Sequence, residues 1–190
     1  MNKTQKKIFD SAIKVFSLSG YDGATMDRVA EVAGVAKGTL YYNFKNKEEL
    51  LNEIIKYGIE FLIDELKEIS SKYSGPVEKL KEICKFQLTF FYQNKDLVKV
   101  VLSQLWGTEK RQYELREMIK DYIKYIRIII EEAIEKEYIN KGDSLILAHI
   151  FFGSMISTSI YDLINSDAGD LDEIINSTIK FIINGLGIQK

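Results

Sequence analysis

Residues 25–44 read TMDRVAEVAGVAKGTLYYNF, and this stretch decides the fold of the N-terminal part of the chain. Thr25 is a residue type that favours the N-cap of a helix. Gly34 can adopt a positive φ and end that helix, and a second helix follows after about three residues, as a helix-turn-helix requires. The apolar residues of the first helix recur at i, i+3, i+4 and i+7, which predicts one buried stripe: Met26, Val29, Ala30 and Ala33.

The second helix of this motif separates its side chains onto two sides. Leu40 and Phe44 are four residues apart, so we expect them to share one side and to pack inward. Gly38 and Thr39 lie on the opposite side, in the first turn. The glycine allows a close approach of the backbone to a DNA groove. The threonine offers a hydroxyl and a methyl group to base edges or phosphate.

The rest of this outer side also carries polar groups that suit DNA. Tyr42 and Asn43 can donate to phosphates, which fix the register of a protein on DNA. Lys37 brings a positive charge to the start of the helix, and Tyr41 lies at its flank. Lys47 adds charge at the N-terminus of the next helix, where backbone N–H groups already favour phosphate. Helix-turn-helix geometry also occurs in bundles that bind no DNA, so the pattern favours DNA binding without excluding that alternative.

The whole chain of 190 residues is predicted to be all-α. It is 46 % hydrophobic and 28 % charged, which is enough to bury a core, and it has a single proline. Apolar residues recur at helical spacing nearly everywhere, and glycines separate the periodic segments. We expect about nine helices, at roughly 4–19, 27–34, 38–44, 47–72, 76–93, 95–106, 109–138, 143–164 and 170–184.

The predicted helices divide the chain into two parts. The first three are short and form a unit over residues 1–46, while the later ones are long and form a larger bundle over residues 47–190. No flexible linker separates the parts, because one helix begins directly at the boundary. Asn46 and Glu49 have the spacing of a capping box at the start of that helix.

Composition excludes several classes of protein. The sole cysteine, Cys84, cannot form an intrachain disulfide, which fits a reducing compartment. The N-terminus lacks the apolar region of a secretory signal, and the apolar run 144–161 contains His149 and several Ser and Thr. We interpret that run as a buried helix and expect a cytoplasmic protein with no membrane span. Residues 1–50 hold eight Lys and Arg against six Asp and Glu, a balance that permits DNA binding.

Enzyme chemistry is not supported by the residues present. His149 is the only histidine and lies in an apolar run, so we expect a hydrogen-bonded core histidine rather than a catalyst. The sequence shows no Cys/His cluster for a metal and no Gly-rich phosphate loop after a strand. Acidic pairs such as Glu131 and Glu132 should lie on solvated helix faces. We predict no catalytic residue, no metal and no cofactor.

The N-terminal part resembles the DNA-binding domain of TetR/AcrR-type bacterial transcriptional regulators. The resemblance covers residues 4 to about 55 and rests on SGYDGAT, VAEVAGV, KGTLYYNF and KNKEEL, which occur in the expected order. Ala36 replaces a frequent serine and Asn43 a frequent histidine. The resemblance implies a homodimer that binds a double-stranded DNA operator through Thr25, Lys37, Gly38, Thr39, Tyr41, Tyr42, Asn43 and Lys47.

The resemblance also implies that the larger part binds a small apolar or amphipathic effector and forms the dimer. Aromatic residues are frequent over residues 76–165, and core packing is the simplest interpretation of each. As a set they would also suit an apolar cavity between helices. Trp106 precedes Gly107 and Thr108, which suggests a corner in the cavity wall. The predicted ligand contacts are Phe86, Phe90, Trp106, Tyr122, Tyr125 and Phe152.

The same resemblance assigns the dimer interface to the helices at 143–164 and 170–184. Their pattern of small and apolar residues would serve packing within one chain equally well, so the sequence leaves both options open. The segments NKDLVKVVLSQLWG, LREMIKDYIKYI and HIFFGSM resemble the ligand domains of acyl-CoA-responsive members, which control fatty-acid degradation. That resemblance implies a fatty acyl-CoA effector, with Lys110, Arg111 and Arg116 as candidates for its phosphates.

The predicted function is a sequence-specific DNA-binding transcriptional regulator, a repressor that its ligand releases from the operator. The alternative from another class is a helical carrier that sequesters apolar molecules and binds no DNA.

Overall fold

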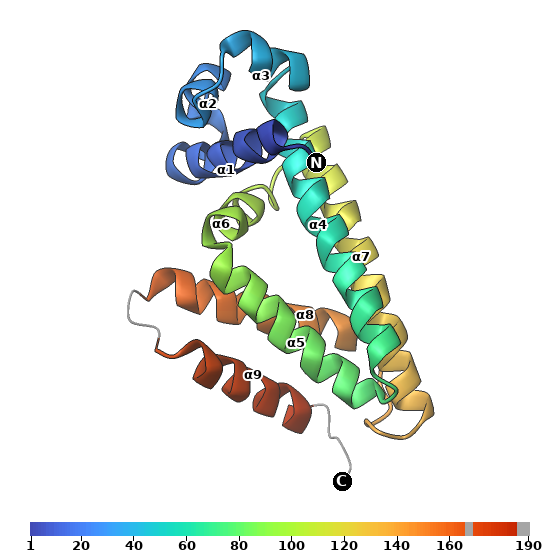
Figure 1. Ribbon diagram of the computed structural model, residues 1–190. Helices are drawn as coiled ribbons and strands as arrows, with labels where there is room; N and C mark the ends of the chain where they lie inside the picture. Colours follow the sequence, from blue (N-terminus) through green and yellow to red (C-terminus); the bar gives the residue numbers. More distant parts are fainter. Residues whose placement is uncertain (166–168, 186–190) are drawn as a thin grey trace. The chain divides into compact units, whose positions relative to one another are not determined.

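The computed structural model describes residues 1–165 and 169–185, and all regular structure in these residues is α-helical (Figure 1). The helices lie close to the predicted ranges. They are α1 (Lys3–Gly23), α2 (Met26–Ala33), α3 (Lys37–Asn43), α4 (Lys47–Lys72), α5 (Pro76–Gln93), α6 (Lys95–Ser103), α7 (Lys110–Glu135), α8 (Ser144–Ile164) and α9 (Leu171–Gly185).

The helices group into two compact units that do not follow the order of the chain. Unit 1 comprises residues 1–60 and 94–118, and unit 2 comprises residues 61–93 and 119–190. Unit 1 is larger than the predicted N-terminal part, because α6 packs against α1 and brings the start of α7 with it. Helices α4 and α7 each contribute residues to both units.

The core of unit 1 contains the predicted apolar stripes. Ile8 and Ala12 of α1 and Leu40 of α3 are fully buried, and the predicted stripe of α2 is buried with them. Burial of each large aliphatic side chain stabilises the fold by about 1.5–3 kcal/mol. Gly20 has a non-helical conformation, with φ of 68° and ψ of 173°, and kinks α1 next to the predicted helix end at residue 19.

In unit 2, α5 packs against α8 and α9, and α8 also packs against α9. Its largest fully buried side chains come from four helices, so the core is continuous across the unit. They include Leu66 of α4, Ile83 of α5, Ile126 and Ile130 of α7, and Phe151 and Met155 of α8.

The expectation that residues 144–161 form a buried helix is wrong for the single chain. Only one stripe of α8 is buried, namely Ala148, Phe151, Met155 and Ser159. His149 is exposed rather than in the core, and its Nδ1 lies 2.8 Å from Leu145 O. Among the described residues, α8 is the helix long and apolar enough to span a membrane, yet only 22 % of that apolar window is buried in the chain. Apolar periodicity could not distinguish a helix covered by its own chain from one with an uncovered apolar side.

Candidate functional site

The turn between α2 and α3 has the predicted geometry. Thr25 caps α2, because its hydroxyl accepts a hydrogen bond from Arg28 N at 3.2 Å. Gly34 adopts the left-handed conformation, with φ of 57° and ψ of 41°, and ends α2. The chain then re-enters a helix at Lys37, so the two helices form the expected helix-turn-helix.

Helix α3 exposes the side that was predicted to face DNA. Tyr42 is 90 % exposed and Tyr41 is 49 % exposed, so core packing does not explain these two rings. A Cβ atom built on Gly38 would meet nothing within 4 Å, so this glycine leaves open space above the first turn. Thr39 is exposed, and Asn43 Nδ2 donates to Thr39 O at 2.8 Å. This side of the helix is therefore polar and accessible.

The start of α3 has no side-chain cap. Ala36 occupies the N-cap position and makes no capping hydrogen bond, as expected where alanine replaces serine. Lys37, the first residue of the helix, forms an ion pair with Asp27 of α2, with 2.6 Å between Nζ and Oδ2. The hydrogen bond to Asp27 raises the pKa of Lys37. The lysine thus stays charged at neutral pH and is held near the start of α3.

Lys47 has a structural role that the sequence did not reveal. Its Nζ donates to Tyr21 O at 2.6 Å and lies 3.4 Å from Asp22 O, so it binds the backbone at the end of α1. The same Nζ lies 4.3 Å from the centroid of the Tyr21 ring. Arg111 of α7 also contacts that ring, with 4.0 Å between its guanidinium carbon and the centroid. Each cation is attracted by the electron-rich ring of Tyr21, and the two contacts join α1, α4 and α7 within unit 1.

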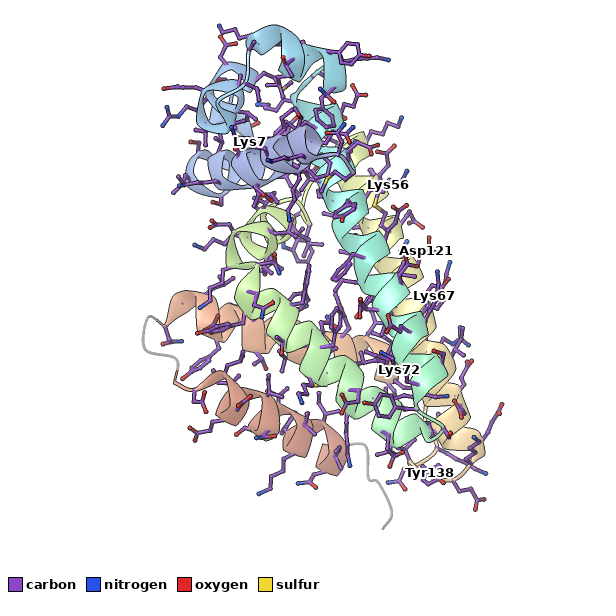
Figure 2. The ribbon with its side chains drawn as sticks, in the orientation of Figure 1. Lys7, Lys56, Lys67, Lys72, Asp121 and Tyr138 are labelled. Carbon is purple, nitrogen blue, oxygen red and sulfur yellow. The ribbon has the colours of Figure 1, made fainter. Side chains whose placement is uncertain are left out.

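Two further lysines of unit 1 are candidates for phosphate contacts. Lys45 is exposed just before α4. Lys7 of α1 reaches the turn of the motif, since a Cβ built on Gly34 would lie 3.4 Å from its Nζ (Figure 2). Lys7 was not predicted from the sequence, because its proximity to the turn depends on how α1 packs against α2.

Five of the six predicted ligand contacts lie in unit 2, and they form two groups. Phe86 and Phe90 of α5 are half-buried and pack on Phe61 of α4, with ring centroids 6.0 and 5.5 Å from that of Phe61. The buried Tyr122 of α7 packs on Phe152 of α8, with centroids 5.7 Å apart. Tyr125 lies one turn beyond Tyr122 on α7, and Lys67 Nζ lies 5.6 Å from its ring centroid (Figure 2).

The sixth, Trp106, belongs to unit 1 and is 82 % exposed. The expected corner exists, because Gly107 has a φ of 134°. However, the indole ring is not packed in a wall, so the interpretation of Trp106 as an ordinary core residue is wrong. Its contact with a ligand stays a prediction. The sequence showed the corner but could not show whether the ring points inward.

The basic residues proposed for the phosphates of a ligand differ in their availability. Arg111 is only 8 % exposed, and its guanidinium is engaged by Tyr21, Gln104 and Glu109. Arg116 donates to Leu105 O at 3.0 Å and to Gly107 O at 3.2 Å. Both arginines therefore hold the loop between α6 and α7. Lys110 is the exposed member of the three, 3.4 Å from Glu114.

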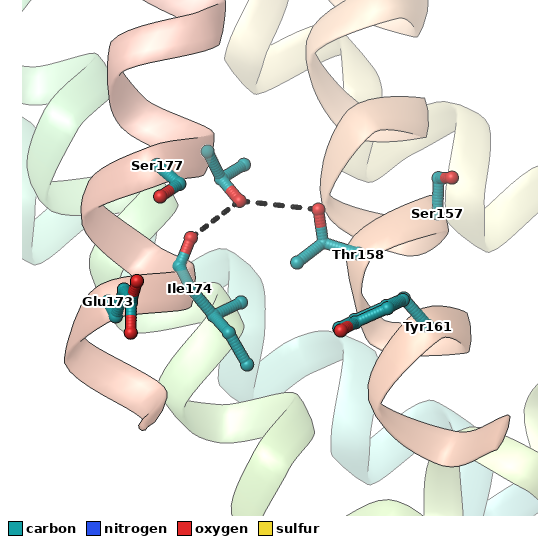
Figure 3. A pocket seen from close by; sticks show the side chains of 7 residues that line it. Ser157, Thr158, Tyr161, Glu173, Ile174 and Ser177 are labelled. Carbon is teal, nitrogen blue, oxygen red and sulfur yellow. Dashed lines mark hydrogen bonds between the residues drawn. The ribbon is translucent and has the colours of Figure 1, made fainter. Parts of the chain in front are cut away.

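An open pocket of about 440 Å³ lies between α8 and α9 (Figure 3). Thr158, Tyr161 and Glu173 are among its lining residues, and the Oγ1 atoms of Thr158 and Thr178 lie 3.3 Å apart beside it. The predicted ligand contacts do not line it. It is polar and open, unlike a site for an apolar chain.

Comparison with known proteins identifies the helix-turn-helix. Residues 8–54 match the family model described as bacterial regulatory proteins of the tetR family. A solved chain from Clostridium perfringens, provisionally described as a fatty acid metabolism regulator, is 45 % identical, with a TM-score of 0.89 over 96 % of this chain and 100 % of that one. The chain belongs to the TetR family.

A protein sequence and a solved structure from Bacillus subtilis are similar over nearly the same length. The fatty acid metabolism regulator protein of strain 168 is 28 % identical over 95 % of this chain and 94 % of its own. The structure of the transcriptional regulator FadR in complex with stearoyl-CoA is 26 % identical, with a TM-score of 0.85 over 95 % and 98 % of the two chains.

As a TetR-family member, the protein is a DNA-binding transcriptional regulator and not an enzyme. The alternative of a carrier that binds no DNA is set aside. The individual DNA-contacting residues stay predictions, and the structure adds to the set Lys7 and Lys45 as candidates.

The two roles of Lys47 lead to a test that separates them. Lys47→Ala should lower the free energy of unfolding by about 1.5–3 kcal/mol. The substitution removes the charged donor that binds the carbonyl oxygens of Tyr21 and Asp22 at the end of α1. If Lys47 also contacts phosphate, the log–log salt slope of operator binding should shrink by roughly 1 per contact, or about 2 per dimer.

Denaturant melts and binding titrations at several salt concentrations measure the two effects. Lys45→Ala is the matched control for stability, since Lys45 is exposed and should leave the unfolding free energy unchanged. An unaltered salt slope in folded Lys47→Ala protein would remove Lys47 from the DNA-contacting residues and leave it the structural role alone.

Proposed function

We propose that this TetR-family protein is a homodimeric repressor of genes for fatty-acid metabolism, and that a long-chain acyl-CoA releases it from its operator. The observation that carries the proposal is the 45 % identity, over 96 % of the chain, to the Clostridium perfringens protein described as a fatty acid metabolism regulator. A regulator of DNA acts where the bacterial chromosome lies, so we assign it to the cytoplasm.

On the DNA side, α3 is the proposed recognition helix. Its exposed first turn carries Gly38 and Thr39, and Tyr42 projects with 90 % of its surface exposed. In a helix-turn-helix dimer, two such helices enter successive major grooves about 34 Å apart. Tyr41, Tyr42, Asn43 and the nearby lysines would then fix the register through phosphates, and Thr39 would contact base edges.

The proposed effector site lies in unit 2. Stearoyl-CoA is bound in the related Bacillus subtilis FadR structure. In this chain, the exposed ring of Phe61 and the half-buried rings of Phe86 and Phe90 form a cluster that an acyl chain would cover. Covering apolar surface yields about 25 cal/mol for each Å² removed from water. An effector that prefers one conformation of the dimer shifts the population away from the DNA-binding form.

The dimer is proposed to form through α8 and α9. Large apolar side chains of both helices are exposed in the single chain, and exposed apolar surface of this kind suits a protein–protein interface. They include Leu145 (42 % exposed), Ile146 (58 %), Ile150 (56 %), Ile164 (74 %) and Phe181 (71 %). A second copy of this chain would cover them, and this also explains why the apolar α8 needs no membrane.

Release of DNA by an acyl-CoA tests the proposed function. DNA from upstream of the protein's own gene serves as the operator, and its affinity is measured by gel shift or fluorescence anisotropy. Stearoyl-CoA should weaken binding by about 5–150-fold, the usual range of coupling between two sites. Free CoA and stearate are the controls and should have much smaller effects. Retention of operator DNA at saturating stearoyl-CoA would contradict the proposed effector, while absence of any DNA binding would contradict the operator assignment.

A further inference from the structure

A glutamine lies at the centre of the apolar face of α5. Gln87 is fully buried, and one turn away on the same face lie Ile83 and Phe91, which are buried too. Tyr122 Oη donates to Gln87 Oε1 at 2.6 Å. Gln87 Nε2 is the one buried side-chain nitrogen or oxygen among the described residues that has no hydrogen-bond partner. A buried donor without an acceptor is unfavourable, because it has lost its hydrogen bonds to water.

The orientation of the amide determines which kind of partner would match it. In the observed orientation, the phenol of Tyr122 donates to Gln87 Oε1. The amide nitrogen Nε2 then has no acceptor for its N–H groups. If the amide were flipped, Nε2 would donate to the phenol oxygen, and both Oε1 and the phenol proton would lack partners. The observed orientation satisfies more groups. The missing partner is therefore a hydrogen-bond acceptor.

The surroundings of this pair favour an acceptor without charge. Cys84 lies one turn before Gln87, and burial raises the pKa of its thiol to about 12. Burial also raises the pKa of Tyr122, whose ring packs on that of Phe152. All three groups are neutral at physiological pH. A carboxylate placed among them would lose its hydration without gaining a cation, whereas a carbonyl oxygen needs only a donor.

An apolar surface adjoins the amide on the same helix. Phe86 and Phe90 are four residues apart and stack on each other, with ring centroids 6.2 Å apart, and Phe90 lies one turn beyond Gln87 on α5. Phe61 packs on both and is 38 % exposed. A hydrocarbon chain lying on these three rings would have the buried amide beside it.

We propose that Gln87 is a specificity-determining residue for the effector, and that its Nε2 donates a hydrogen bond to the neutral carbonyl oxygen of an acyl thioester. This inference rests on the proposed function and identifies the chemical group of the effector that the protein recognises. Tyr122 acts as a positioning residue, because its hydroxyl holds the amide with Nε2 free to donate. The acyl chain lies against Phe61, Phe86 and Phe90.

A comparison of two CoA compounds tests the assignment on the full-length protein. Stearoyl-CoA carries the thioester carbonyl, and S-octadecyl-CoA, a thioether, replaces that carbonyl by CH₂. Calorimetric titration below the micelle concentration should show that the wild type binds the thioester about tenfold more tightly. In the double variant Gln87→Met with Tyr122→Phe, the two compounds should bind within about twofold of each other, mainly because the affinity for the thioester falls.

The double variant replaces both hydrogen-bonding partners by apolar groups of similar shape, so its melting temperature should be at least that of the wild type. Gln93→Met, at the exposed end of α5, is the matched control and should keep the tenfold preference. Equal affinity of the wild type for the two compounds, or an unchanged preference in the double variant, would overturn the role of Gln87. Binding of neither compound by the wild type would instead overturn the proposed function.

Discussion

Ile150→Asp should convert the dimer into monomers and lower operator affinity by at least about a hundredfold. Ile150 lies on α8 and is 56 % exposed in the single chain, with Ile146 and Ile164 also exposed on this helix. An aspartate in the proposed dimer interface would be removed from water without a cation, and that cost opposes association. Monomers lose the second half-site, and linking two binding modules raises avidity by about 10²–10⁴.

Sedimentation measures the mass of the variant, and fluorescence anisotropy measures its operator affinity. Because Ile150 is exposed in the single chain, the monomer should keep the helical circular dichroism of the wild type. Tyr138→Asp is the matched control. Tyr138 is 45 % exposed in the loop after α7, outside the proposed interface, so this variant should remain a dimer. A dimeric Ile150→Asp variant that binds the operator normally would exclude the central part of α8 from the interface.

The helices could be predicted from sequence because their signals are local. The apolar repeat of α2 and the residue types at Thr25 and Gly34 depend only on neighbours along the chain, and the structure confirms the stripe, the cap and the positive φ. Likewise, Leu40 and Phe44 are buried as their spacing predicted.

Features that depend on tertiary contacts could not be predicted in the same way. The charge of Lys47 suggested a phosphate contact, but its bonds to the carbonyl oxygens of Tyr21 and Asp22 exist only because α1 ends beside the start of α4. The exposed side of α8 has the same apolar pattern as a helix buried in one chain. The orientation of Trp106 could not be predicted either, since the sequence shows a corner but not the direction of the ring.

Gln87 was missed for a different reason. One polar residue in an apolar stripe carries no sequence signal of its own, because most glutamines in helices are exposed. Only its full burial, and the unmatched Nε2 beside the bond to Tyr122, distinguish it. A buried polar group without a partner is a sharper indication of a ligand than the aromatic residues around it, which a plain core would also contain.

Gly38→Ala should stabilise the fold and weaken operator binding, two effects of opposite sign. A glycine inside a helix is less favourable than alanine by about 0.5–1 kcal/mol, so the substitution should raise the unfolding free energy by that amount. Nothing in the chain opposes the new methyl group, because a Cβ at this position meets nothing within 4 Å. In the complex, that methyl group would occupy the space through which the first turn of α3 approaches DNA. We expect a loss of at least about tenfold in operator affinity, since the recognition helix must move away from base edges whose contacts contribute about 1–3 kcal/mol each.

Gly58→Ala provides the comparison that isolates the effect on DNA. Gly58 lies inside α4 in unit 1, and a Cβ built there would be in ordinary contact with Leu97 Cδ2 at 3.5 Å. This variant should gain a similar stability and bind the operator like the wild type. Thermal melts and titrations of both variants against one operator supply the measurements. If Gly38→Ala were as tight a binder as Gly58→Ala, the backbone at Gly38 would not approach the DNA closely, and α3 would have to contact the operator through another face.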